Sequence, residues 1–301
     1  MDNVSYKTLL DETPEYALKV KQYAKLLIDQ KIWDSISHSS LESWLNNFKS
    51  QEEELIAALL LDGLVYRSAQ QTTSLLIAAL ECALPFAVYN TPDAIISGLD
   101  FIKIFSSKTI DNSIKIVPVI RDADPPTKSG PSIARMYRRQ LGINDDYMIW
   151  PWLIDSNVKA GVKTIVFIDD VLATGNQASD FLKGLKLERY PEVDFSYIPL
   201  LAHEDGINKL IKDHPKIKVS AVEVIDNTNC FFKIEKMAQI GDLEDLYLSV
   251  SKKHLNKRLY KGMAKGYKDL ALTFSYYHAT PNASLPLYWY ESETFSPLVR
   301  R

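Results

Sequence analysis

The stretch that most constrains the fold is residues 162–177, which read VKTIVFIDDVLATGNQ. It opens with a β-branched apolar run, Thr164–Ile168, of the kind found in strands that are buried on both faces of a parallel sheet. Two carboxylates, Asp169 and Asp170, stand at the carboxyl end of this run and precede a turn of small residues. Apolar residues then recur at helical spacing from Ala178 to Leu187. The pattern predicts a strand, an acidic pair, a tight turn and a helix.

The turn after the acidic pair suits an anion. In open α/β sheets, ligands bind beyond the carboxyl ends of the strands, and a helix amino terminus offers unpaired N–H groups and the positive end of a dipole. Backbone amides and a threonine hydroxyl can therefore receive a phosphate, while the carboxylates accept hydrogen bonds from vicinal hydroxyls or face a hydrated metal ion. A phosphorylated sugar satisfies both halves. The residues expected at the phosphate are Ala173, Thr174, Gly175, Asn176 and Gln177.

Residues 164–177 resemble the phosphoribosyl pyrophosphate (PRPP) loop of the type I phosphoribosyltransferases. That loop is a hydrophobic strand followed by two acidic residues, two mostly small or apolar residues, a small residue, Thr, Gly, Gly and a hydroxyl residue. The match is close over Ile165–Gly175 and departs at Asn176 and Gln177, where the family usually has Gly and then Thr or Ser. Asn tolerates positive φ, so the turn can still form, whereas Gln177 removes a hydroxyl from the expected phosphate site. A solvated acidic turn in another α/β protein is the alternative.

The resemblance implies an α/β fold with a parallel-sheet type I phosphoribosyltransferase-like core and an N-terminal helical region. It implies PRPP or a related phosphoribosyl nucleotide as ligand, with Asp169 and Asp170 as catalytic residues that grip the ribose hydroxyls and contribute to a Mg²⁺ site. The expected reaction is phosphoribosyl transfer to a nucleobase-like or other acceptor, with hydrolysis of a nucleotide or nucleoside as a variant. The alternative function is a non-catalytic module that senses PRPP or a nucleotide and acts through partner proteins.

A second loop carries charge suited to a pyrophosphate. Lys128, Ser129 and Gly130 directly precede a helix predicted over Pro131–Leu141, with proline at its first position. We expect Lys128 to stabilise the leaving group as a catalytic cation, and we expect Ser129, Gly130 and Arg135 to bind it. The alternatives are a basic surface helix after an ordinary loop, and a mobile lid over the transition state. The basic residues of this helix are Arg135, Arg138 and Arg139.

Two regions are expected along the chain. Residues 1–83 are predicted to be helical and to serve as a cap, a dimerisation element or a partner-binding region, and residues 84–301 are predicted to form the phosphoribosyltransferase-like domain. Strands are expected at 85–89, 113–120, 164–168, 193–201, 219–225 and 270–275. Helices are expected between them at 93–105, 131–141, 178–187 and 205–212, with a long helix at 242–259. This alternation is typical of parallel βαβ units.

The tail, residues 266–301, is rich in aromatic residues and prolines. Prolines around His278, Asn282 and Trp289 predict a rigid loop that can stack on a flat base and read its edge, so these three are the expected substrate-binding residues. The alternative is a proline-fixed loop that packs Trp289 into the core.

With the helical front and the PRPP-type loop, the tail resembles phosphoribosyltransferase-like proteins of bacterial conflict systems, some of which are encoded beside retron reverse transcriptases in phage defence. The resemblance implies a toxin-like effector that partners hold inactive, with a protein or a reverse transcriptase–noncoding RNA complex as the partner. A homo-oligomer is a further expected assembly. The residues that carry the resemblance are Pro281, Asn282, Pro286, Tyr288, Trp289, Pro297, Leu298 and Arg300.

Composition argues against several other classes of protein. A net charge of −3 and a pI near 6.0 disfavour a generic nucleic-acid binder, although they leave room for a local basic patch. Cys82 and Cys230 stand in apolar stretches and are expected to be buried reduced thiols. No run approaches the roughly 18 apolar residues of a membrane span, and the first residues lack a secretory pattern, so a cytoplasmic location is expected. There is no P-loop, nucleophile elbow or zinc-ligand spacing.

Overall fold

The computed structural model describes residues 4–85, 103–125 and 128–301. Its contacts group the chain into two compact units. We call Thr73–Ile225 the sheet unit, and we call the residues up to Thr72 together with Asp226–Arg301 the terminal unit, because it contains both chain ends. The grouping does not follow the boundary expected at residue 83.

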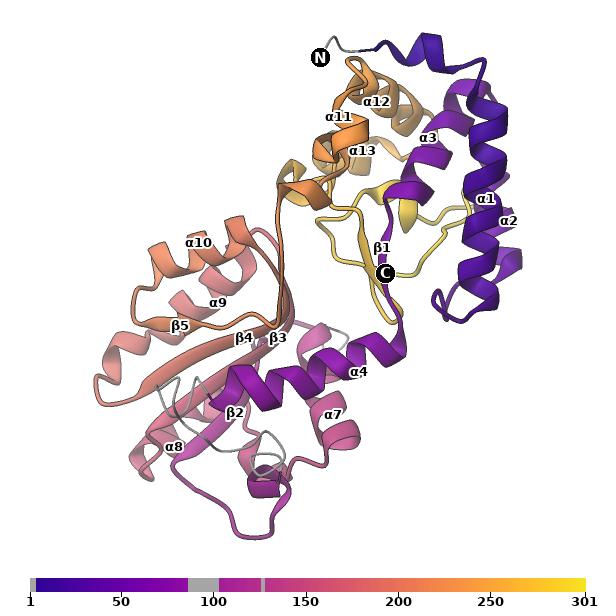
Figure 1. Cartoon of the computed structure of the whole chain (residues 1–301). Helices are drawn as coiled ribbons and strands as arrows, with labels where there is room; N and C mark the ends of the chain where they lie inside the picture. Colours follow the sequence, from indigo (N-terminus) through magenta and orange to yellow (C-terminus); the bar gives the residue numbers. More distant parts are fainter. Residues whose placement is uncertain (1–3, 86–102, 126–127) are drawn as a thin grey trace. The chain divides into compact units, whose positions relative to one another are not determined.

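The sheet unit is built on parallel strands (Figure 1). The order is β2-β3-β4-β5, and β6 also pairs with β4. Strand β3 pairs with β2 on one side, where Ile116 stands opposite Val166, and with β4 on the other, where Phe167 stands opposite Tyr197. The strands are β2 (Ile114–Pro118), β3 (Thr164–Leu172), β4 (Asp194–His203), β5 (Ile217–Val219) and β6 (Glu223–Ile225). The expected parallel α/β core is confirmed.

Helices cover both faces of this sheet. Alternate residues of a strand point to opposite faces, so Val166 packs in the cluster that contains Ile133 of α7, whereas Phe167 packs in the cluster that contains Phe181 of α9. Buried residues of α4 share the first cluster, and those of α8 and α10 share the second. The helices are α4 (Ala69–Ala78), which continues as a π-helical turn over Ala79–Ala83, α7 (Ser129–Leu141), α8 (Ile154–Lys159), α9 (Asn176–Leu185) and α10 (Glu204–Asp213).

The terminal unit combines the first helices with the last segment of the chain around one core. A short parallel pair joins the two segments, with β1 (Val65–Arg67) beside β7 (Phe274–Tyr276). The helices are α1 (Thr13–Asp29), α2 (His38–Leu45), α3 (Gln51–Gly63), α11 (Glu235–Ala238), α12 (Leu243–His254) and α13 (Lys257–Met263). Figure 1 shows the indigo amino-terminal helices and the yellow carboxyl-terminal segment within this unit.

Buried hydrogen bonds connect the two segments of the terminal unit. The indole of Trp44 donates to the carbonyl oxygen of Leu287 at 2.7 Å, and the hydroxyl of Tyr288 donates to the carbonyl oxygen of Leu60 at 2.7 Å. Both aromatic side chains are buried in the same core. The segments therefore stabilise each other, which is why the carboxyl-terminal tail groups with the first helices rather than with the sheet.

Several local expectations were wrong. Pro131 is the third residue of α7 rather than the first, a position where its missing N–H is still unneeded. Trp150 and Trp152 lie in an apolar stretch that would favour the core, yet they are 41% and 54% exposed. Cys82 is exposed, whereas Cys230 is buried as expected.

The predicted helix at 242–259 is two helices, because Asn256 caps a new one by accepting a hydrogen bond from the Leu259 N–H at 2.9 Å. The strand predicted at 270–275 is shorter and shifted, and the one predicted at 219–225 falls into the short strands β5 and β6. The strand predicted at 85–89 and the helix predicted at 93–105 lie mostly outside the described residues.

Replacing Trp44 with Ala tests the mutual support of the two segments. Loss of a buried indole and its hydrogen bond should destabilise the terminal unit by about 3–5 kcal/mol. Amide hydrogen exchange, read by mass spectrometry, should then accelerate in residues 226–301 as well as in 4–72. The exposed Trp152→Ala serves as the matched control and should change stability by no more than about 0.5 kcal/mol. Faster exchange confined to residues 4–72 would contradict the shared core.

Candidate functional site

Strand β3 carries the acidic pair to the carboxyl edge of the sheet. It extends beyond the predicted run to Leu172, so Asp169 and Asp170 lie within the strand near its end. The chain turns at Gly175, whose φ of +72° is a left-handed conformation that glycine adopts without strain. Helix α9 then begins at Asn176, which does not have a positive φ. The strand, turn and helix expected from the sequence are present, and Gly175 alone makes the left-handed turn.

The turn is seated against the start of α10. A Cβ at Gly206 would lie 2.4 Å from the carbonyl oxygen of Ala173, and a Cβ at Gly175 would lie 2.9 Å from the carbonyl oxygen of Gly206. Only glycines allow this approach, so Gly206 positions the loop, a role that sequence reasoning missed although a glycine early in a helix is a signal of close packing. Helix α10 is capped by His203, whose Nδ1 accepts a hydrogen bond from the Asp205 N–H at 3.1 Å.

The two carboxylates of the pair have different surroundings. Asp169 is 4% exposed, and its Oδ2 accepts a hydrogen bond from the Tyr197 hydroxyl at 2.5 Å while its Oδ1 accepts one from the Asp170 N–H at 3.0 Å. Asp170 is half-buried, and its carboxyl lies within hydrogen-bond reach of the Asp169 carboxyl. Asp169 is turned into the core and held by Tyr197, and the expectation that both carboxylates meet a ligand stays a prediction.

Burial dominates the electrostatics of this pair. Desolvation, followed by the charge of Asp170, raises the pKa of Asp169 well above its ordinary value of 3.8, and the hydrogen bond from Tyr197 opposes that rise. Desolvation and the nearby Asp169 likewise raise the pKa of Tyr197. A buried carboxyl that resists ionisation beside a strand end is typical of a functional site.

Asn176 and Thr174 form a side-chain hydrogen bond within the turn. Asn176 donates from Nδ2 to the hydroxyl oxygen of Thr174 at 3.1 Å. Because that oxygen then acts as an acceptor, the hydroxyl proton of Thr174 remains available for a ligand oxygen. Gln177 is exposed and supplies no hydroxyl. The structure thus gives Asn176 a positioning role that differs from the positive φ expected of it.

The second predicted anion loop leaves the same edge of the sheet. Lys128 is the N-cap residue of α7, and Ser129 and Gly130 are its first two residues. A Cβ at Gly130 would lie 2.6 Å from the carbonyl oxygen of Val119, so the start of α7 is pressed against the end of β2. Since β2 and β3 are adjacent parallel strands, both predicted loops stand at neighbouring strand ends.

Arg135 faces a different surface. It lines a groove of about 720 Å³ beside α7, which we call the basic groove. None of residues 169–177 lines this groove, so the structure does not bring Arg135 together with the PRPP-type loop there. The groove is lined by Lys128, Pro131, Ser132, Ala134, Arg135, Arg138, Arg139, Asp145, Met148 and Trp150.

The tail residues lie in the terminal unit. Trp289 is 8% exposed, and its indole donates to the carbonyl oxygen of Ser284 at 3.2 Å, which fits the alternative of packing into the core. His278 stacks on Tyr276 with ring centroids 5.2 Å apart. The carbonyl oxygen of Asn282 accepts a hydrogen bond from the Tyr267 N–H at 2.8 Å. Burial leaves little of the Trp289 ring for stacking on a base.

The donor set for a metal ion is small. Within residues 4–85, 103–125 and 128–301, no three His, Cys, Asp or Glu side chains are grouped in a way that would hold an ion. Asp170 is the more accessible of the pair. These residues fit a magnesium ion held mainly by ligand oxygens, which is how Mg²⁺ is often bound with phosphates.

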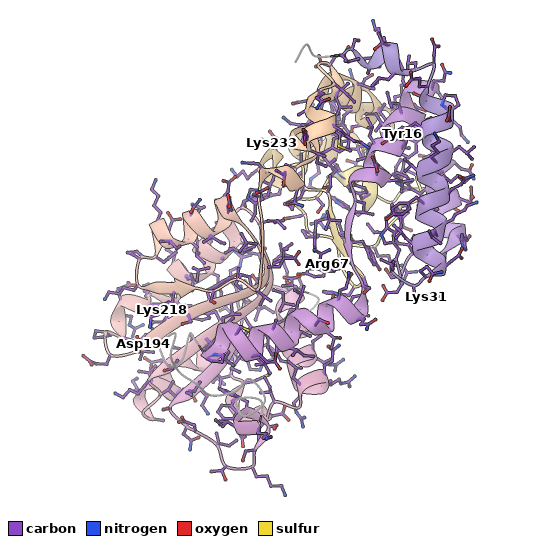
Figure 2. The ribbon with its side chains drawn as sticks, in the orientation of Figure 1. Tyr16, Lys31, Arg67, Asp194, Lys218 and Lys233 are labelled. Atoms are coloured by element: carbon purple, nitrogen blue, oxygen red, sulfur yellow. The ribbon has the colours of Figure 1, made fainter. Side chains whose placement is uncertain are left out.

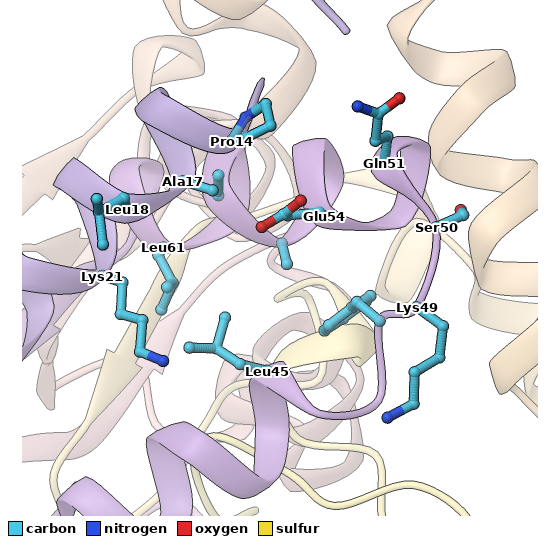
Figure 3. A pocket seen from close by; sticks show the side chains of 13 residues that line it. Pro14, Ala17, Leu18, Lys21, Leu45, Lys49, Ser50, Gln51, Glu54 and Leu61 are labelled. Atoms are coloured by element: carbon cyan, nitrogen blue, oxygen red, sulfur yellow. The ribbon is translucent and has the colours of Figure 1, made fainter. Parts of the chain in front are cut away.

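The terminal unit has a pocket of its own, of about 580 Å³, between α1, α2 and α3 (Figure 3). Its lining is mostly apolar, with Lys21, Lys49 and Glu54 among the polar side chains, and it includes none of the residues predicted to act on a ligand.

In the part of the chain that is described, none of the helices has the length and apolarity needed to span a bilayer.

One family model and two curated proteins are similar to this chain. The family model PRTase-CE, a phosphoribosyltransferase-type domain, matches residues 41–301. Two Arabidopsis thaliana proteins are distantly similar. Uridine kinase-like protein 3 is 24% identical over 170 residues, covering 53% of this chain and 34% of that protein, and uridine kinase-like protein 4 is 23% identical with the same coverage. The chain thus spans about a third of the length of these curated relatives.

The raised pKa of Asp169 predicts that ionising this carboxyl lowers the free energy of unfolding as the pH rises. A carboxyl whose folded-state pKa lies above its unfolded value stabilises the protein below the unfolded pKa, and this stability is lost as the pH rises through the folded pKa. Asp169→Asn removes the titrating group. Its unfolding free energy relative to the wild type should therefore rise above about pH 4 by up to about 1.4 kcal/mol per pH unit until the folded pKa is passed. Urea unfolding in EDTA-containing buffer measures this, and a difference that does not change with pH would contradict it.

Proposed function

The chain belongs to the PRTase-CE family, and from this premise we propose that it binds PRPP, or a related phosphoribosyl nucleotide, and transfers the phosphoribosyl group to a nucleobase-like or other acceptor. The β3–α9 loop is the observation that carries the proposal. It combines a left-handed glycine, a helix amino terminus, an oriented threonine hydroxyl and an acidic pair at one strand end.

The 5′-phosphate would sit on the amides at the start of α9. Gly175 at the N-cap has no side chain to occupy them, and the hydroxyl of Thr174 has a proton to donate. Asp170 would accept hydrogen bonds from the ribose hydroxyls. The close contact of Gly206 with Ala173 keeps the loop in this form, so little reorganisation is needed on binding.

Breaking the bond between C1 and pyrophosphate creates positive charge on the ribose ring. Asp170 would stabilise that charge, because a carboxylate placed where charge develops acts without reorganisation. Asp169 would act as a positioning residue, since its two oxygens are engaged by Tyr197 and by the N–H of Asp170. When bound, a magnesium ion would neutralise part of the charge of the pyrophosphate.

The departing pyrophosphate would meet the start of α7. Lys128 at the N-cap provides positive charge there, and Ser129 and Gly130 provide backbone amides. Arg135 is not included, because it lies about two helical turns beyond Lys128, further along the basic groove that both residues line. The acceptor is the open part of the proposal, and the names of the relatives make uracil and uridine the first compounds to test.

A second candidate is a PRPP-sensing module that signals to a partner without turnover. The exposed Gln177 favours it, because the loop then lacks the hydroxyl that the family usually places at the phosphate. The resemblance of the tail makes an effector of phage defence, controlled by partner molecules, the proposed setting for either candidate.

The test is release of pyrophosphate from PRPP with Mg²⁺ by the purified protein, with bases and nucleosides as acceptors. Asp170→Asn should reduce the rate by at least about 100-fold, since it removes charge stabilisation of the transition state. Asp194→Asn is the matched control. It makes the same substitution at the opposite end of the sheet, where exposed Asp194 lies 3.9 Å from Lys218 (Figure 2).

Equal rates for the wild type and Asp170→Asn would refute the catalytic role of Asp170. PRPP that raises the melting temperature of the wild type without any pyrophosphate release would instead support the sensing module.

A further inference from the structure

The basic groove concentrates positive charge in a chain that is acidic overall. Four basic side chains line it, against one acidic side chain, Asp145. Arg135, Arg138 and Arg139 stand on one face of α7 at helical spacing, and the distance along the helix from Lys128 to Arg139 is about 16 Å. A row of this length is longer than one phosphate group, so it suits a polyanion.

The arginines of the groove differ in their partners. Arg138 pairs with Asp145, with Nε 2.7 Å from the carboxylate oxygen. In the described part of the chain, neither Arg135 nor Arg139 forms an ion pair, and both are exposed. Two guanidinium groups are therefore ready to bind an anion, while a third is partly neutralised.

A stacked pair of tryptophans adjoins this charge. The rings of Trp150 and Trp152 are 5.2 Å apart between centroids and 8° from parallel, and Trp150 lines the groove. Both are substantially exposed, a costly placement for large apolar rings unless they contact something else. Bases stack on such rings irrespective of sequence.

From this juxtaposition we propose that the basic groove binds single-stranded nucleic acid, with backbone phosphates on Arg135 and Arg139 and a base stacked on Trp150. Single strands fit because their bases are free to stack, whereas the faces of duplex bases are covered by their neighbours. The groove shares Lys128 with the proposed pyrophosphate site, whereas none of residues 169–177 lines it.

Fluorescence anisotropy with labelled oligothymidylate and oligouridylate tests the proposal on the full-length protein. The wild type should bind both single strands more tightly than a duplex, and its affinity should fall as salt rises from about 50 to 200 mM. Arg135→Gln with Arg139→Gln should weaken binding at least tenfold and reduce the salt slope by about 1.4, because two phosphate contacts are lost. Trp150→Ala should weaken binding by a factor of about 5 to 100.

One substitution should improve binding. Asp145 is 72% exposed on its side chain, so Asp145→Asn does not disturb a core. It removes the one acidic group of the groove and frees Arg138, and we expect it to tighten binding several-fold. A gain of affinity cannot arise from misfolding.

Matched controls remove the same groups elsewhere. Lys257→Gln with Arg258→Gln removes two exposed charges from α13, and Tyr23→Ala removes an exposed ring from α1; both should bind as the wild type does. Absence of binding at about 50 mM salt would overturn the proposal. Equal weakening by the control variants, equal affinity for the duplex, or weaker binding by Asp145→Asn would also overturn it.

Discussion

The candidate site depends on the pairing of β3 with a neighbour on each side. Strands β2 and β4 flank it in parallel, and apolar clusters cover both of its faces. Pairing with β4 brings the Tyr197 hydroxyl to the buried Asp169 carboxyl, while the Asp170 carboxyl is half-buried and lies within hydrogen-bond reach of Asp169. The fold itself therefore divides the acidic pair into a buried carboxyl that supports the strand end and a more accessible one that can meet a ligand.

The strand end, the turn and the helix could be predicted from residues 162–177 because each is determined by local sequence. The β-branched run, the single left-handed glycine and the helical spacing of α9 are all local signals. The burial of Asp169 and the contact between Gly206 and Ala173 could not be predicted, because they depend on residues that the sheet brings in from β4 and α10.

The two compact units differ from the expected domains for the same physical reason. Trp44 and Tyr288 are more than two hundred residues apart, and only the folded chain shows that their hydrogen bonds join the first helices to the tail. The prolines in the tail predicted a rigid loop for stacking on a base or for packing Trp289, and the structure places Trp289 in a core. Trp150 and Trp152 show the converse, because these large apolar side chains on either side of Pro151 are exposed, and Trp150 lines the groove with the arginines.

The family and the loop together point to one central claim, that the β3–α9 turn binds PRPP. Amide hydrogen exchange with and without PRPP and Mg²⁺ measures this most directly. The account predicts slower exchange on binding in the peptides that cover residues 169–179 and 128–135, in the wild type but not in Asp170→Asn combined with Thr174→Ala. PRPP binding that leaves exchange in residues 169–179 unchanged, or that slows exchange equally in the double variant, would contradict it.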